Sequence, residues 1–515
     1  MAASGDGGEL HGMYERKLRA LTLAAAAKRV LDPKLDTTWE RYITVYLSHR
    51  DAVATDLACL VSSYDEEAPL AAARALDAKQ ADGGALPPLL AAPFVIADNL
   101  ETSVGVTSAG LSFLDEWEAG VDGPLVEAAQ AAGGLLIGKA VLSELSFATT
   151  GVNPTFGTPR NPHVRSLIAG GGVASAVAAR FATFGLGIDG RGAGLRVPAA
   201  LCGVVAFRPT IGRLPTTGSI AVSPTRDSAG IVARSVGDAY LIDAALTGSA
   251  TAPAHEALPD MKPLAGITLA KPTGGFWDDL DEGVAAETAR AIATLESKGV
   301  TFVDVDVDPS AAKGPGGEPF GESASVATTA IATSRAIGAA LDGREAVTAV
   351  SEYFWERGAR TSVLDIAAAV LAEPTLSRLH AQLRSDRSGF ASLAESLDAT
   401  VRGREALRVS LAAAMADAGA VAMVWPAVSR LPCTLAEAEA DEGGELDAAF
   451  GRNASVAANA GMCSVVLPCG AAGAGAARLP VALELAMPAG SDEELLAVAR
   501  AVEAALPAPQ APRGL

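Results

Sequence analysis

The residues that could form a catalytic site gather around one glycine-rich stretch, residues 168–208. It contains the cluster Gly170–Gly172, an alanine-rich segment, and a second glycine-laced loop that runs up to Arg196. Glycines at this density indicate a backbone that takes positive φ angles or approaches another group closely. Two such loops on either side of an apolar segment predict the walls of a site.

The reactive side chains near these walls all have ordinary structural interpretations. Ser175 fits a cap at the start of a helix, and Cys202, in an apolar run, fits a small buried residue. Lys139 fits a strand end where it pairs with backbone or carboxylate groups. Asp189 and Arg196 fit an ion pair that holds the loop. The glycine-rich walls of a site are present, but the catalytic side chains expected between them are missing.

One motif in the stretch imitates a nucleotide site. Residues 185–190 satisfy the pattern G-x-G-x-x-G. In a dinucleotide site the third glycine opens a helix directly after a strand. Here the chain continues through more glycines to Pro198 with no helical stripe, so we expect no nucleotide and no other cofactor.

Composition favours a large protein with a buried core. Half of the 515 residues are hydrophobic and 19% are charged, which excludes global disorder. The formal net charge is −20. Nucleic-acid backbones and anionic membranes are bound through basic patches, so we expect neither as a main partner.

Cysteine and histidine usage argues against a disulfide framework or a metal site. The five cysteines are scattered without a C-x-x-C pair, and H-E-x-x-H is absent. The first residues lack the apolar segment of a signal peptide. The uncharged run 453–477 is interrupted by Pro468 and many glycines, which favours buried core over a membrane span. We therefore expect a cytoplasmic protein without bound metal.

Apolar periodicity predicts alternating helices and strands. Helices are predicted at 14–31, 38–61, 70–79, 124–133, 284–298 and 492–506, with 323–420 mainly helical. Strands are predicted at 93–97, 135–137, 183–188, 267–270, 301–307, 421–425, 464–467 and 481–485. This alternation predicts an α/β fold with a mixed, mostly parallel central sheet flanked by helices.

The chain is expected to fall into three parts. Residues 1–80 form an N-terminal helical region packed on the body, residues 81–506 form one main domain, and residues 507–515 form a flexible tail.

Motifs within residues 85–240 resemble, in the same order, those of the amidase signature family. They are Pro88-Leu89 with Pro93-Phe94 and Asp98-Asn99, Ile137-Gly138-Lys139, Phe156-Gly157 with Arg160-Asn161-Pro162, Gly170-Gly171, Gly187-x-Asp189, Arg196-Val197-Pro198-Ala199, and the run Gly203–Leu214. The resemblance implies the α/β amidase-signature fold and hydrolysis of amide C–N bonds.

Motifs in the C-terminal part are similar, more narrowly, to the amidase domain of allophanate hydrolases. They include Thr434-Leu435-Ala436-Glu437, Gly451-Arg452-Asn453, Val466-Leu467-Pro468 and Leu479-Pro480-Val481.

The resemblance also implies where catalytic groups should stand. The family uses a serine nucleophile, a second serine in a cis peptide and a lysine, while backbone N–H groups of the glycine loop hold the oxyanion. Carried over through the motifs, the lysine position is Ala97 and the bridging serine is Gly172. The nucleophile position is Gly194, or Ala193 when counted forward from Asp189. All three catalytic side chains are therefore substituted.

The resemblance then implies a catalytically impaired pseudo-amidase that acts by binding or regulation. The alternative is an active amidohydrolase of the allophanate or urea-derived-amide type with a relocated nucleophile, or a gene-model error in the loop. A small amide-type ligand is expected in a pocket lined by Asp98, Asn99, Gly170, Gly171, Asp189 and Arg196. A homodimer or a protein partner is left open.

Overall fold

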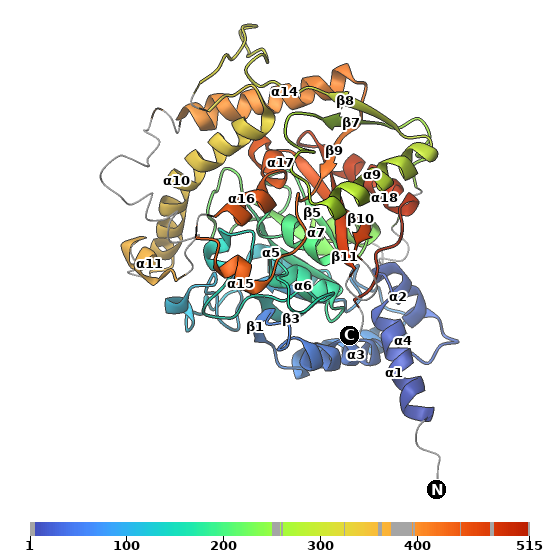
Figure 1. The fold of residues 1–515 in the computed structure, drawn as a ribbon. Coiled ribbons are helices and arrows are strands. Elements are labelled where there is room, and N and C mark those ends of the chain that lie inside the picture. The colour runs from blue at the N-terminus through green and yellow to red at the C-terminus, as the bar shows by residue number, and fades with distance from the viewer. Residues whose placement is uncertain are drawn as a thin grey trace.

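The computed structural model describes residues 6–249, 261–323, 325–358, 363–371, 397–442, 444–473 and 478–512, together with residues 258 and 394. One large sheet runs through the molecule, with helices on both sides (Figure 1). Among the described helices, none is both long enough and apolar enough to cross a membrane.

The strands lie in one sheet of 11 strands, in the order β1-β3-β2-β4-β6-β5-β10-β11-β9-β7-β8. Their bounds are β1 (Leu60–Ser63), β2 (Pro93–Ala97), β3 (Leu135–Ala140), β4 (Phe184–Asp189), β5 (Val205–Arg208), β6 (Ser228–Ala233), β7 (Thr268–Pro272), β8 (Thr301–Val305), β9 (Ala422–Pro426), β10 (Cys463–Ala472) and β11 (Leu479–Met487).

The helices cover both faces of this sheet. Their bounds are α1 (Asp6–Arg19), α2 (Leu23–Leu31), α3 (Trp39–Val53), α4 (Glu67–Ala81), α5 (Pro124–Ala131), α6 (Gly172–Ala178), α7 (Arg196–Cys202), α8 (Val236–Leu246), α9 (Glu282–Ser297), α10 (Ala330–Glu356), α11 (Val363–Ala369), α14 (Arg404–Asp417), α15 (Leu435–Glu439), α16 (Glu445–Gly451), α17 (Ala454–Ala460) and α18 (Asp492–Ala505). Short turns η1 (Ser112–Leu114), η2 (Glu144–Ser146) and η3 (Asp398–Gly403) complete the elements.

The sheet is mixed, as predicted, but its parallel pairing is confined to two blocks. Strand β2 pairs in parallel with β3 and β4, and β7 pairs in parallel with β8 and β9. Between these blocks β4, β6, β5, β10, β11 and β9 pair antiparallel. The prediction of a mostly parallel sheet was wrong for this centre, because β5 and β6 were missed and because β10 and β11 form an antiparallel hairpin.

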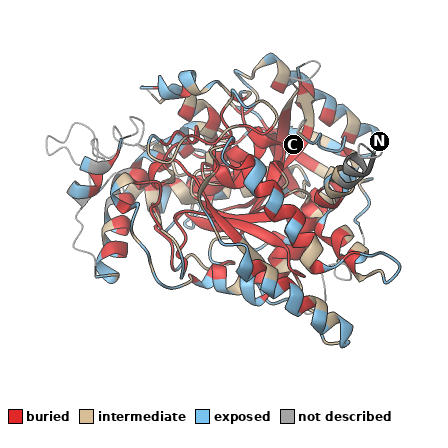
Figure 2. Ribbon diagram, turned by 90° about the horizontal axis from the view of Figure 1, so that it is seen from below, coloured by how far each residue is buried: buried red, intermediate tan, exposed pale blue. Residues whose placement is uncertain are grey.

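The strands of the sheet are largely buried (Figure 2), and alternation of side chains along the central strands divides them between two apolar cores. In β2, Phe94 and Ile96 enter the core that includes α5, α8 and α18, and Phe94 stacks on Phe184. Val95 and Ala97 enter the other core, which includes α3, α6 and α7. Successive side chains of a strand point to opposite faces, so Ala97 lies on the face that carries the glycine-rich helices.

The N-terminal part is bonded to the body and contributes a strand to the sheet. The predicted helix at 38–61 ends at Val53, and β1 follows, paired antiparallel with β3. The predicted helix at 14–31 is two helices, because Thr22 caps α2 by accepting a hydrogen bond from the backbone N–H of Ala25. Residues 1–80 are therefore not purely helical.

A short helix also stands where the sequence showed no helical stripe. Arg196–Cys202 forms α7, which ends at Gly203 with φ +71°. A left-handed residue, usually glycine, commonly ends a helix. The helix begins six residues after Gly190, so the pattern G-x-G-x-x-G still lacks the geometry of a dinucleotide site.

We predict that His49 makes stability depend on pH. Its Nε2 donates a hydrogen bond to the carbonyl oxygen of Ala179 at 2.9 Å. Burial, aided by the charge of Arg19, lowers the pKa of His49 to about 4. The unfolded state binds a proton near the ordinary value of about 6.5, so the free energy of unfolding falls as pH drops from about 6.5 to 4. In His49→Gln this contribution is absent.

Thermal unfolding midpoints of both proteins, measured between pH 4 and 7.5, test this prediction. The other titrating groups are present in both proteins, so the difference between their curves of unfolding midpoint against pH gives the contribution of His49. Parallel curves would contradict the assignment.

Candidate functional site

The three positions implied to carry catalysis lie within packed backbone. Ala97 ends β2 with 6% of its surface exposed, Gly172 opens α6, and Gly194 lies in the loop before α7. A Cβ atom on Gly172 would overlap the carbonyl oxygen of Cys59 and lie 2.8 Å from the backbone nitrogen of Val141. A Cβ atom on Gly194 would overlap the carbonyl oxygen of Ile188. Neither glycine has space for a side chain.

Leu195 fills the volume next to Ala97. A Cβ atom on Gly187 would lie 2.9 Å from Cδ2 of Leu195 and 3.2 Å from Cβ of Ala97. A Cβ atom on Gly230 would lie 2.8 Å from Cδ1 of the same leucine. Leu195 is fully buried and belongs with Ala97 and Val173 to one apolar core. The centre of the expected site is therefore hydrocarbon.

Lys139 is held by a buried ion pair. Its Nζ lies 3.3 Å from Oδ1 of Asp98, and both side chains are fully buried. The same ammonium donates to the carbonyl oxygen of Val106 at 2.5 Å and to Oγ1 of Thr107 at 2.7 Å. Burial lowers the pKa of Lys139, against the attraction of Asp98. An ammonium group has three donors, so this lysine is engaged in structure, as predicted.

Asp189 and Arg196 form the predicted ion pair, within a larger buried network. Oδ1 of Asp189 lies 2.9 Å from Arg196 and 3.1 Å from Arg208. Arg196 also donates to Glu484 at 2.6 Å. Burial acts to raise the pKa of Asp189, but Arg196 and Arg208 together hold it below its usual range. The network joins the β4–α7 loop to β5 and β11.

Two other candidates have structural contacts. Ser175 is the fourth residue of α6 rather than its cap, and its hydroxyl donates to the carbonyl oxygen of Arg160 at 2.8 Å. Cys202 is fully buried, as predicted, and burial raises the pKa of its thiol. Neither side chain lines the cavity described next.

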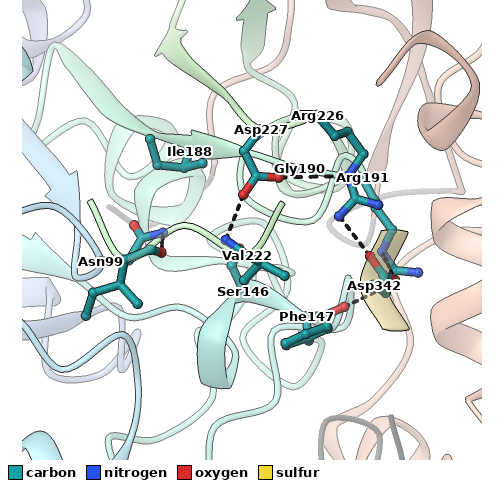
Figure 3. A pocket seen from close by; sticks show the side chains of 11 residues that line it. Asn99, Ser146, Phe147, Ile188, Gly190, Arg191, Val222, Arg226, Asp227 and Asp342 are labelled. Carbon is teal, nitrogen blue, oxygen red and sulfur yellow. Dashed lines mark hydrogen bonds and ion pairs between the residues drawn. The ribbon is translucent and has the colours of Figure 1, made fainter. Parts of the chain in front are cut away.

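A small cavity of about 20 Å³ lies beyond the ends of β2 and β4 (Figure 3). It has room for about one water molecule. Its wall consists of Asn99, Ser146, Phe147, Ile188, Gly190, Arg191, Ile220, Val222, Arg226, Asp227 and Asp342. Of the six residues predicted to contact a ligand, only Asn99 lies on this wall. Gly170 and Gly171 pack against Pro198. Ligand contact by the five predicted residues other than Asn99 stays a prediction.

Two arginines on the wall of this cavity form ion pairs with the same aspartate. Arg226 pairs with Asp342 at 2.8 Å and Arg191 with Asp342 at 3.3 Å (Figure 3). Arg191 also donates to the carbonyl oxygen of Phe147 at 2.6 Å. The buried Oδ1 of Asn99 has no hydrogen-bond partner among the described residues. The arginines thus narrow the space between these side chains.

Ser146 is the wall residue with a nucleophilic side chain, and the sequence analysis missed it. Its backbone φ is +56°, a left-handed conformation that non-glycine residues rarely adopt. A Cβ atom on Gly194 would lie 3.5 Å from Oγ of Ser146. No local pattern marks this serine, because the fold and not the spacing brings it beside residue 194.

The described part of the chain contains no cluster of metal-binding side chains. No group of three or more histidine, cysteine, aspartate or glutamate side chains there is placed to hold a metal ion.

Comparison with known proteins places this architecture. The family described as Amidase matches residues 41–496. The chain is 31% identical over 422 residues to an indoleacetamide hydrolase of Allorhizobium ampelinum, covering 81% of this chain and 84% of that protein. It is 30% identical over 509 residues to a mandelamide hydrolase of Pseudomonas putida, covering 94% and 91%.

A solved structure agrees in fold. A peptide amidase in complex with the competitive inhibitor chymostatin superposes with a TM-score of 0.77 at 24% identity, covering 96% of this chain and 99% of that one. The similarity thus lies with indoleacetamide, mandelamide and peptide amidases. These relatives do not support the narrower expectation of an allophanate hydrolase.

Proposed function

The chain belongs to the amidase family, and from that premise we propose that it is a non-hydrolytic member acting by binding or regulation. One observation carries the proposal. The implied lysine position, Ala97, packs with Leu195 in a continuous apolar core. The two implied serine positions, Gly172 and Gly194, lack room even for a Cβ atom. Removing one member of a catalytic triad costs several orders of magnitude in rate.

A second candidate function, amide hydrolysis through Ser146, has an observation of its own. This hydroxyl lies on the cavity wall beside residue 194 with a strained backbone, and strained residues cluster at active sites. The similar proteins are named as hydrolases of indoleacetamide and mandelamide. In this candidate, Ser146 forms an ester with loss of ammonia, and water then releases the carboxylic acid.

Ammonia release by the purified full-length chain separates the two functions. Indoleacetamide, mandelamide and phenylacetamide serve as substrates. We expect no ammonia above that from a heat-inactivated sample, because no activated nucleophile is available. Circular dichroism of the same sample shows that the protein is folded.

The Ser146→Ala variant decides the meaning of any turnover. Turnover that disappears in this variant would overturn the proposal and establish the second candidate. Turnover that persists would overturn both and point to another nucleophile, which mass spectrometry of the trapped acyl-enzyme would locate.

A further inference from the structure

A second cavity, of about 420 Å³, lies at the opposite end of the central strands. Along the antiparallel pair β4–β6, Asp189 faces Ser228 near the first cavity, whereas Phe184 faces Ala233 near the second. Five residues of strand separate the two ends, which is roughly 17 Å at about 3.3 Å per residue. The second cavity is therefore separate from the site described above.

Four helix ends and one extended segment form its wall. The helices α6, α7 and α18 end there, α8 begins there, and residues 508–512 cover one side. Apolar wall residues include Val177, Val204, Leu506 and Pro509. This volume and lining are typical of small-molecule pockets, which are mostly apolar with a few polar groups.

Two guanidinium groups stand on this wall. Among the described residues, Arg180 makes no side-chain hydrogen bond and no ion pair. Arg234 donates its Nη groups to the carbonyl oxygens of Arg19 and Leu21 and to the hydroxyl of Tyr46 at 3.4 Å, and its Nε is buried away from the cavity, so this guanidinium contributes charge to the wall. Unpaired donors at a wall favour an anionic group, since arginine binds carboxylates and phosphates through charge-assisted hydrogen bonds.

Two other polar groups on the wall, Glu503 and His163, are held by backbone groups and do little to repel an anion. Both carboxylate oxygens of Glu503 accept the backbone N–H of Val236 at 3.0 Å, and burial raises the pKa of Glu503 to about 7. The ring Nε2 of His163 lies 3.0 Å from the carbonyl oxygen of Cys202. Positive charge therefore exceeds negative charge on this wall, in a chain whose net charge is −20.

The backbone of Arg180 adds an independent observation. Its φ is +66° directly after α6, where glycine is the usual residue. A non-glycine residue in this conformation is strained. Strain of this kind concentrates at functional positions, and here it holds an arginine at the mouth of a cavity.

We propose that this cavity binds a small carboxylic acid with an apolar body. The carboxylate accepts hydrogen bonds from Arg180 beside the positive charge of Arg234, while the body packs on Val177, Val204 and Leu506. The apolar lining favours a carboxylate on a hydrocarbon or aromatic body over a free phosphate. This binding is independent of whether the chain hydrolyses amides.

Calorimetric titration of the full-length protein with phenylacetate tests the proposal at pH 7.5. Phenylacetamide has the same shape without the charge, and we expect it to bind at least about tenfold more weakly, as lost charge-assisted hydrogen bonds predict. Arg180→Gln should weaken phenylacetate by at least a similar factor. Arg165→Gln is the matched control, because Arg165 is exposed and, within the described ranges, pairs with Asp56 alone; this variant should bind phenylacetate as the unmodified protein does.

The Arg180→Gly variant separates a loss of binding from a loss of folding. Glycine relieves the left-handed backbone, so this variant should unfold at no lower temperature and still lose phenylacetate binding. Undetectable phenylacetate binding, equal binding of the amide, or unchanged binding in Arg180→Gln would overturn the proposal. So would inorganic phosphate that binds more tightly than phenylacetate. Because phenylacetate has no amide bond, none of these outcomes depends on the hydrolysis assay.

Discussion

Replacing Arg196 with methionine lowers the free energy of unfolding by about 3–5 kcal/mol, the range expected when one partner of a buried ion pair is removed. Arg196 is fully buried between Asp189 and Glu484. Without it Asp189 keeps Arg208, but among the described residues Glu484 retains only neutral donors such as the indole N–H of Trp425 at 3.2 Å. Urea unfolding at pH 7 measures the loss.

Two further variants make this result specific. Arg165→Met removes an ion pair whose arginine is 45% exposed, and exposed pairs contribute little, so its midpoint should not move. Arg196→Met combined with Glu484→Leu should recover part of the stability, because the unpaired buried carboxylate is then gone. If the single variants at 196 and 165 unfold at the same urea concentration, the network does not stabilise the fold as described.

The Gly194→Ser variant, which restores a hydroxyl at the implied nucleophile position, should lose at least about 3 kcal/mol, the upper range for overpacked sites. Its Cβ atom would overlap the carbonyl oxygen of Ile188, which is part of strand β4 and cannot move alone. Gly172→Ser should behave similarly, since its Cβ atom meets the backbone of Cys59 and Val141. Thermal unfolding and the yield of folded protein report both effects.

Gly316→Ser is the control for these substitutions. No atom lies within 4 Å of a Cβ atom on Gly316, and surface changes of this kind usually stay within about 0.5 kcal/mol. A Gly194→Ser protein as stable as this control would show that the loop before α7 has space for a side chain. Ammonia release that appears in Gly194→Ser would also overturn the proposed loss of hydrolysis.

Elements with strong local signals could be predicted from the sequence. The stripe Trp39, Ile43, Tyr46 and Leu47 is buried in α3 as expected, and the apolar run 93–97 is the buried strand β2. Strand β6 was missed because its sequence, SAGIVA, mixes small residues with a central glycine. Gly230 is required there, since its Cβ atom would lie 2.6 Å from the carbonyl oxygen of Phe207 on β5.

Both the buried ion-pair network and the small cavity are formed by residues that lie far apart along the chain, so motif spacing in the sequence cannot reveal them. Asp189 and Arg196 are seven residues apart, and their pairing could be predicted. Glu484, which completes the network, is 288 residues from Arg196. Asn99, Ser146 and Asp342 likewise meet at one cavity from three separate segments. Only the folded sheet brings these residues together.

The packing of Leu195 beside Ala97 bears on how such a sequence can change with time. A lysine at 97 would start within the apolar core that holds this leucine, and a serine at 172 or 194 needs neighbouring backbone to move. Under the proposed function, each single change to one of the family's catalytic side chains lowers stability before any catalytic advantage exists. Epistasis would then hold this arrangement in place, and hydrolysis would be gained more readily through a different hydroxyl than through positions 97, 172 and 194.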